Sequence, residues 1–211
     1  YLGHKWCNYW LHSEHLHDST GKMSKSKGEF LTISLLEEKG YSPLVYRLFC
    51  LNSHYRKTLV FSYEGIEQNK IVYEKLIRKI ATMKSNIEGE LQLDKFENYK
   101  NLFKGALEND LNTSNAITVL FNVLKDEDLT NKTKITLVES FDNVLSLGLL
   151  DSSSSKKIAT ELEQYILTMI EKRKEAKINR DFVLADQIRD DLLANGIVLK
   201  DTREGTTYEK I

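Results

Sequence analysis

Residues 22–26 read Lys-Met-Ser-Lys-Ser, with Gly21 before them and Lys27-Gly28 after them. Two ammonium groups and two hydroxyls on such a loop suit a clamp for a polyphosphate, because lysines act as point charges and glycines let the backbone close around the ligand. A solvated basic loop is the alternative for a generic run of lysines. The unbroken pentapeptide favours nucleotide binding, because a match of this length rarely arises by chance.

A second group with reactive side chains precedes this loop. His12, His15 and His17 lie close in sequence to Cys7, and borderline ligands at such spacing invite a metal interpretation. The only other cysteine is Cys50, so the sequence offers neither a disulfide framework nor a paired-cysteine zinc motif.

Charge is sorted along the chain although the net charge is only -1. Residues 1–60 carry eight Lys or Arg against five Asp or Glu, and residues 168–180 carry five against two. Residues 86–130 are acidic, with four against nine. Two separated basic patches suit a polyanion that is gripped at two points, whereas solvated helix faces are the plain alternative.

The loop must be positioned by the elements around it. Residues 1–20 show no sustained helical period, which predicts a strand and a loop. Thr32 or Ser34 can cap a short helix that ends at Gly40, and Ser42-Pro43 starts another. Residues 58–62 are expected to be extended, and apolar residues from Ile66 to Met83 recur at the spacing of a long amphipathic helix.

The remaining chain is predicted to be helical up to a short β-hairpin. Residues 94–148 contain three amphipathic segments with short connections, which favour an antiparallel bundle. Residues 152–155 are interpreted as a polar linker or cap, followed by helices over about 156–177 and 181–193. Asn195-Gly196 ends the second helix, and two short strands over 197–201 and 206–210 complete a small α+β unit.

Several segments together resemble the cysteinyl-tRNA synthetases, a family of class I aminoacyl-tRNA synthetases. The pentapeptide alone is typical of class I as a whole, and the cysteine family is indicated by the other segments, which occur in the family's order: Trp10-Leu11-His12-Ser13, His54-Tyr55-Arg56, Asp110-Leu111-Asn112-Thr113, Asp181-Phe182, Ala185-Asp186, and the tail from Gly196 to Asp201 and from Gly205 to Thr207.

This resemblance implies a mainly α chain in four parts: the end of a Rossmann-type catalytic core (1–21), the KMSKS loop with a helical stem-contact region (22–88), a DALR-type antiparallel helix bundle (89–152), and a small α+β anticodon-binding unit (153–211). The implied reaction joins cysteine to tRNA(Cys) through a cysteinyl-adenylate, with ATP and Mg²⁺. The resemblance also implies a monomer in the cytoplasm. Composition agrees, since no apolar run is long enough to cross a membrane.

The resemblance assigns roles to individual residues. Lys22 and Lys25 are the expected catalytic cations, and Met23, Ser24 and Ser26 complete the ATP clamp. Trp10 and His12 are expected to form a wall of the cysteine and adenylate pocket, with burial of Trp10 in the core as the alternative. The chain departs from the family at Lys27-Gly28-Glu29, where an apolar residue and Asn are usual, which puts the loop's phosphate affinity in doubt.

For the C-terminal unit, the resemblance implies contacts with tRNA. The carboxylates of Asp186 and Asp201 can accept hydrogen bonds from base edges. Phe182 could stack on a splayed base or be buried. The basic residues of this unit are expected to bind phosphates or bases: Arg173, Lys177 and Arg189. The alternative is that they lie on solvated helix faces. Lys177 stands where the family commonly has Arg, which weakens any bidentate base contact there.

The family's zinc, which binds the substrate thiolate, takes its ligands upstream of Tyr1, so we expect no metal ligand in this chain. The nucleotide-binding HIGH element is also absent from the sequence, so the chain alone is expected to be inactive. Two alternatives are a non-catalytic tRNA-binding fragment or paralogue, and a related cysteine:amino-sugar ligase. An anticodon-reading tail over residues 181–207 counts against the second.

Overall fold

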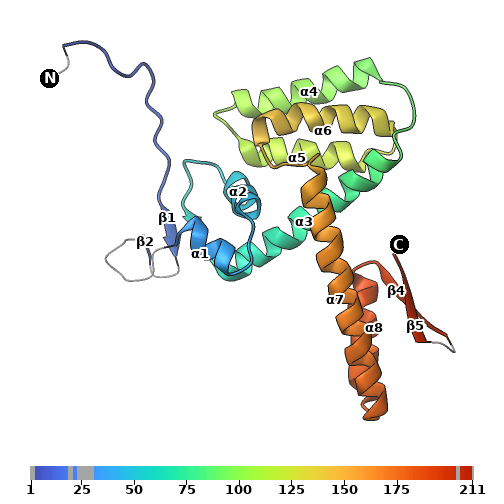
Figure 1. Ribbon diagram of the computed structural model, residues 1–211. Helices are drawn as coiled ribbons and strands as arrows, with labels where there is room; N and C mark the ends of the chain where they lie inside the picture. Colours follow the sequence, from blue (N-terminus) through green and yellow to red (C-terminus); the bar gives the residue numbers. More distant parts are fainter. Residues whose placement is uncertain (1–2, 19–20, 23–30, 203–204, 211) are drawn as a thin grey trace. The chain divides into compact units, whose positions relative to one another are not determined.

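The computed structural model describes residues 3–18, 21–22, 31–202 and 205–210. These residues form eight helices and five short strands (Figure 1). The prediction of a mainly helical chain is therefore confirmed for the described part. The chain divides into two compact units, residues 1–154 and 155–211.

The first unit begins with a three-stranded sheet in the order β2-β1-β3. The central strand β1 (Leu16–Asp18) pairs antiparallel with β2 (Gly21–Lys22) and parallel with β3 (Leu59–Val60). His17 stands opposite Lys22 on one side and Val60 on the other. The sheet thus fixes the backbone from which the predicted phosphate clamp begins.

Two short helices follow, and their starts agree with the sequence. Thr32 caps α1 (Ile33–Glu38) by accepting from the Leu35 N–H at 3.1 Å. Ser42 caps α2 (Pro43–Leu51), which has proline in its first turn, where no partner for a backbone N–H is needed. The predicted face of α2 is buried, with Val45, Leu48 and Phe49 inside.

Helix α3 (Tyr63–Ser85) leads to a three-helix bundle (Figure 1). Its buried side chains recur at helical spacing: Ile66, Tyr73, Leu76, Ile77 and Ile80. The bundle consists of α4 (Leu93–Glu108), α5 (Thr113–Lys125) and α6 (Asn131–Leu145), all of which contact one another. Phe103 and Phe141 stack at its centre, with ring centroids 4.1 Å apart. This burial stabilises the bundle.

The last elements are α7 (Ser152–Ile178), α8 (Phe182–Ala194), β4 (Ile197–Thr202) and β5 (Gly205–Lys210). The antiparallel hairpin β4–β5 confirms the two predicted strands. The core of this unit is small and apolar, formed by Ile166, Ile188, Leu192, Ile197 and Leu199. Gly196 turns the chain from α8 into β4 at φ +76°, a backbone conformation that glycine adopts without strain.

One boundary differs from the sequence-based expectation. Residues 152–155, interpreted as a linker or cap, form the first turn of α7. Serines favour caps and turns locally, yet these four belong to a helix with a total length of 27 residues. Among the described helices, none combines the length and the apolar composition that a bilayer crossing requires.

Candidate functional site

The predicted ATP clamp lies largely outside the described residues. Met23, Ser24, Lys25 and Ser26 belong to the stretch 23–30, which the structure does not describe. Lys22 is placed through its backbone alone, in β2 opposite His17. The nucleotide-binding role of these residues therefore stays a prediction.

Trp10 and His12, the predicted pocket wall, lie together on an exposed segment. Their rings stack with centroids 6.0 Å apart and an interplanar angle of 11°. Trp6 meets Trp10 edge-on, at 5.1 Å. Trp10 keeps 66% of its surface exposed, so it is not part of the core of the described residues.

Two segments that the sequence offered only as signs of resemblance meet around one carboxylate. We call His54, Tyr55, Arg56 and Asp110 the Asp110 centre. The Tyr55 hydroxyl donates to Asp110 Oδ1 at 2.6 Å, and Arg56 Nε lies 2.7 Å from Asp110 Oδ2. His54 Nε2 donates to the Asp110 carbonyl oxygen at 2.8 Å. These contacts join the connection after α2 to the turn between α4 and α5.

Hydrogen bonds and charge set the protonation of this centre. The hydrogen bond from Tyr55, and next the one from Arg56, lower the pKa of Asp110. The pKa of Tyr55 is raised, chiefly by its hydrogen bond to the carboxylate. Asp110 is therefore an ionised acceptor at neutral pH, while Tyr55 keeps its proton.

The backbone at this turn is unusual for residues other than glycine. Asp110 and Leu111 both have positive φ, +53° and +52°, directly after α4 ends. Asn112 then caps α5 by accepting from the Asn115 N–H at 3.1 Å. The hydroxyl of Thr113 donates to the Leu51 carbonyl at 2.7 Å and ties this turn to α2. An aspartate tolerates the left-handed region better than most side chains, which suits Asp110 to this position.

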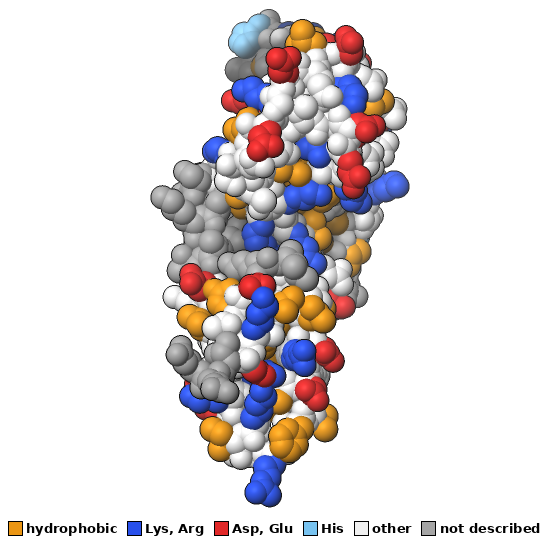
Figure 2. Space-filling view, turned by 90° about the vertical axis from the view of Figure 1, so that its right-hand side faces the viewer, with side chains coloured by type: hydrophobic (Ala, Val, Ile, Leu, Met, Phe, Trp, Pro, Cys, Tyr) orange, Lys and Arg blue, Asp and Glu red, His pale blue; other side chains and the backbone are white. Residues whose placement is uncertain are grey.

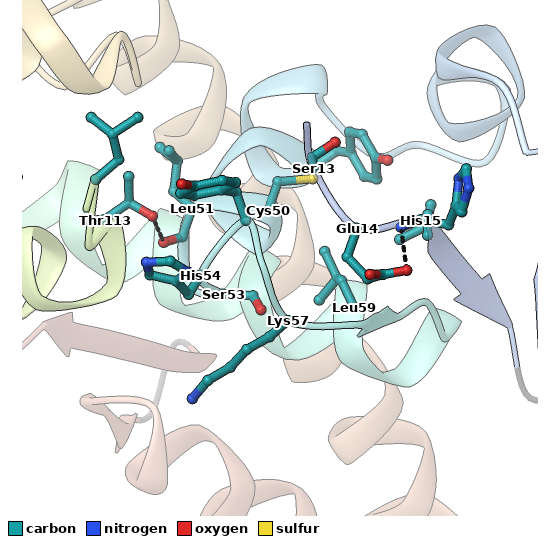
Figure 3. A pocket seen from close by; sticks show the side chains of 14 residues that line it. Ser13, Glu14, His15, Cys50, Leu51, Ser53, His54, Lys57, Leu59 and Thr113 are labelled. Carbon is teal, nitrogen blue, oxygen red and sulfur yellow. Dashed lines mark hydrogen bonds between the residues drawn. The ribbon is translucent and has the colours of Figure 1, made fainter. Parts of the chain in front are cut away.

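Beside the Asp110 centre lies a pocket of about 530 Å³ (Figure 3). Its lining combines the end of α2 with residues 13–16 and the turn before α5, and it includes Glu14, Cys50, His54, Lys57 and Thr113. Burial raises the pKa of the Cys50 thiol, so that thiol is protonated at neutral pH. The Glu14 N–H donates to the Tyr55 carbonyl at 2.8 Å, which fixes the N-terminal segment against the pocket.

In the second unit, the structure brings together three of the six predicted tRNA-binding residues. Arg173 donates from Nη1 to Asp201 Oδ1 at 2.8 Å and from Nη2 to Oδ2 at 3.0 Å. Lys177 Nζ donates to Oδ2 at 2.9 Å. The Thr206 hydroxyl donates to Oδ1 at 2.7 Å. We call Arg173, Lys177, Asp201 and Thr206 the Asp201 centre.

The helix and hairpin geometry explain this arrangement. Arg173 and Lys177 are four residues apart and therefore share one face of α7. Asp201 pairs with Thr206 in the hairpin register, close to the β4–β5 turn. Hydrogen bonds from Arg173, then Lys177, then Thr206 hold the pKa of Asp201 far below its usual range. The carboxylate is therefore ionised and accepts hydrogen bonds only.

The other three predicted residues lie on α8. Phe182 follows the N-cap Asp181 and is 62% exposed, so the alternative that it is buried does not hold within the described part. Asp186 and Arg189 are also exposed. Asp186 acts on the Asp201 centre at longer range, since its charge contributes to raising the pKa of Arg173.

The surface of this unit mixes cations with apolar side chains. Ile178, Phe182 and Val183 are all more than half exposed near the turn between α7 and α8. Figure 2 shows hydrophobic, basic and acidic side chains side by side in this region. A surface of this kind combines stacking platforms with phosphate-binding cations.

Metal binding has no support from the described side chains. No group of three or more His, Cys, Asp or Glu among them could hold an ion. None of the described residues is therefore assigned to a metal site. The zinc ligands predicted upstream of Tyr1 stay a prediction.

Sequence reasoning missed two features of the candidate sites. Asp110 was noted only as part of a motif, and its three partners lie more than 50 residues away. Thr206 was noted as part of the tail, but its bond to Asp201 depends on hairpin register. The Thr206–Asp201 contact could have been predicted from the short spacing between the two expected strands, since this spacing places residues 201 and 206 opposite each other.

Comparison with known proteins covers most of these elements. Residues 1–71 match the family model described as "tRNA synthetases class I (C) catalytic domain", and residues 102–150 match the "DALR domain". The first match contains the predicted clamp and the His54–Arg56 segment, and the second contains the Asp110 turn.

Curated relatives match the chain from end to end. The cysteine–tRNA ligase of Borrelia turicatae is 34% identical over 100% of the chain and 46% of the relative. The cysteine–tRNA ligase of Treponema denticola is 34% identical over 99% of the chain and 47% of the relative. That of Brachyspira hyodysenteriae is 34% identical over 98% and 46%. The chain thus spans about half the length of these relatives.

Proposed function

We propose that this chain, which belongs to the cysteine–tRNA ligase family and fits its C-terminal portion, supplies the ATP clamp and the tRNA-binding parts of an enzyme that joins cysteine to tRNA(Cys). The observation that carries this proposal is the similarity of the whole chain, across both compact units, to cysteine–tRNA ligases. A cysteine:amino-sugar ligase is disfavoured, because the match includes the Asp201 hairpin.

Within this function, residues 1–21 end a Rossmann-type catalytic core and residues 22–88 hold the KMSKS loop and a stem-contact region. Residues 89–152 form an antiparallel bundle, and residues 153–211 form the anticodon-binding unit. The mutual contacts of α4, α5 and α6 support the third part. The separate apolar core beneath β4 supports the fourth. Cytoplasmic residence and a monomeric state stay predictions.

The ATP clamp is assigned to the chemistry of adenylate formation. Cysteine attacks the α-phosphate of ATP, and negative charge develops on the departing pyrophosphate. Lys22 and Lys25 neutralise that charge, while Ser24 and Ser26 donate hydrogen bonds and Met23 packs against the nucleotide. Trp10 and His12 form part of the wall around the adenylate. The pairing of β2 with β1 supports this assignment, since it anchors the start of the clamp.

The tRNA contacts are assigned to the second unit. Asp201 and Asp186 accept hydrogen bonds from bases, Phe182 stacks on a splayed base, and Lys177 and Arg189 face phosphates. The exposure of Phe182 supports its role. Arg173 takes part through Asp201, because its side chain is only 6% exposed and its guanidinium is engaged by that carboxylate.

Two experiments test the two halves of the proposal. In the intact enzyme, Lys25→Ala should slow cysteine-dependent pyrophosphate exchange by about 10² to 10³-fold. Unchanged exchange would remove the clamp role. For the chain as it stands, filter binding should show a preference for a tRNA(Cys) transcript over transcripts of other tRNAs at the same salt concentration. Equal binding would remove the anticodon assignment.

A further inference from the structure

The Asp201 carboxylate has no unoccupied acceptor position. A carboxylate offers about four lone-pair sites, two on each oxygen. Oδ1 accepts from Arg173 and Thr206, and Oδ2 accepts from Arg173 and Lys177. A base edge can therefore reach Asp201 only if one of these donors leaves.

The donors are not equally free to leave. Arg173 is 6% exposed, and its Nε is buried without a hydrogen-bond partner among the described atoms. Moving its remaining N–H groups off Asp201 would leave a buried guanidinium without partners, which is costly. The bidentate fork also fixes the carboxylate plane, because two parallel bonds allow one orientation.

Lys177 differs from Arg173 in each of these respects. Its side chain is 41% exposed, and it reaches Asp201 through one hydrogen bond from a flexible stem. Exposed ion pairs of this kind contribute little to stability. An ammonium that leaves Oδ2 can turn to solvent or to a nearby phosphate without being buried.

We infer that Lys177 is a displaceable placeholder on Asp201 Oδ2, and that Arg173 is the positioning residue that holds the carboxylate while an unpaired base of tRNA takes the place of Lys177. This inference rests on the proposed function of Asp201. On binding, the base N–H replaces the lysine at Oδ2, and the released ammonium pairs with the RNA backbone. Arg173 therefore favours base selection by orienting the carboxylate, whereas Lys177 competes with the base for Oδ2.

The experiment measures a discrimination ratio with the full chain. The probes are a tRNA(Cys) transcript and the same transcript with its three anticodon bases removed, and the ratio is the second dissociation constant over the first. Arg173→Met should lower this ratio at least tenfold, toward one. Arg173→Lys, which keeps the charge but not the fork, should restore part of it. Because this partial rescue depends on the positive charge that lysine keeps at residue 173, general loss of structure would not produce this pattern.

Lys177→Met should leave the ratio unchanged or raise it by up to about fivefold, because the base no longer competes with the ammonium. It should weaken binding of both transcripts by a common factor and lower the slope of log affinity against log salt by about 0.7, the loss of one phosphate contact. The matched control is Lys174→Met, whose lysine is exposed and bonds to Glu171 at 3.3 Å instead of Asp201. It should leave the ratio unchanged.

The outcomes separate the inference from the function beneath it. If Lys177→Met lowers the ratio as far as Arg173→Met does, Lys177 is a reader and the placeholder role is wrong. If Arg173→Met leaves the ratio unchanged while amide exchange shows an intact β4–β5 hairpin, the positioning role is wrong. A wild-type ratio of one would overturn the anticodon function and this inference together.

Discussion

The Asp110 and Asp201 centres share one arrangement, in which an ionised aspartate accepts hydrogen bonds from an arginine and a hydroxyl. Their carboxylates are almost equally exposed, with 47% of the side chain accessible at Asp110 and 49% at Asp201. Their arginines differ sharply, since Arg56 is 66% exposed and Arg173 only 6%. The two centres therefore differ chiefly in how deeply the arginine is buried.

This contrast teaches how burial changes the meaning of similar distances. An exposed arginine that loses its aspartate returns to water, and the exchange costs little. A buried arginine has no such alternative, so its aspartate is held firmly. The Asp110 centre therefore joins two segments adaptably, whereas the Asp201 centre presents a fixed acceptor, which suits recognition of a base.

The strongest test of this contrast compares the two arginines. Arg173→Met should lower the unfolding free energy of the second unit by about 2 kcal/mol, because it leaves Asp201 without its main partner. Arg56→Met should have a clearly smaller effect on the first unit. Urea titration of the full chain, with amide exchange to locate the loss, measures both. Equal losses of unfolding free energy would show that burial of the arginine does not determine how strongly it holds its aspartate.

Lys134 is a second buried cation, and unlike Arg173 it cannot form a bidentate pair with a carboxylate. Lys134 is 7% exposed, and burial, followed by the charge of Lys79, lowers its pKa. The unfolded chain thus holds this proton more tightly, and the charge opposes folding at neutral pH. Lys134→Met should stabilise the first unit by up to about 1 kcal/mol in urea titration. Destabilisation of that size would show that Asp126 and Glu127 compensate the charge more than expected.

The backbone of the Asp110 centre provides a further test. Asp110 has φ +53°, which Asn tolerates and Ala does not. Asp110→Asn should lower the melting temperature of the first unit less than Asp110→Ala does, although both remove the charge. Calorimetry on the two variants measures the difference. If the melting temperature falls equally in both variants, the charge of Asp110 matters for stability and its backbone conformation does not.

The smallest expected effect is the acid response of the Asp201 centre. The pKa of Asp201 is lowered in the fold, so its stabilising contribution is present above the unfolded value of about 3.9 and is lost as pH falls toward the folded value. The protection of the β4–β5 amides from exchange, relative to the unfolded chain at the same pH, should therefore fall below about pH 4. Asp201→Asn should show a flatter response over the same window. An identical pH response would contradict the ion pair.

Local features of the fold were readable from sequence because their causes are local. Proline after Ser42 starts α2, Gly196 with positive φ ends α8, and the spacing from Ile66 to Ile80 marks the buried face of α3. Continuation of α7 through the serines at 152–155 was missed, since propensity yields to the cooperativity of a long helix.

The candidate sites were only partly readable. The sequence indicated Arg173, Lys177 and Asp201 as separate contacts. That both cations bind the Asp201 carboxylate depends on how the hairpin packs against the helix. The positive φ of Asp110 was not predicted, because aspartate tolerates the left-handed region but more often adopts other conformations, so the residue type alone does not fix φ. Burial of one arginine and exposure of the other follow from packing alone.

The proposed role of Asp201 is tested by measuring, at one salt concentration, the affinities of the full chain and of its Asp201→Asn variant for tRNA(Cys) and for a non-cognate tRNA. If Asp201 reads a base, the variant should bind tRNA(Cys) about tenfold or more weakly and the non-cognate tRNA unchanged. An equal loss for both transcripts, or no loss for either, would contradict the assignment of tRNA recognition to the Asp201 centre.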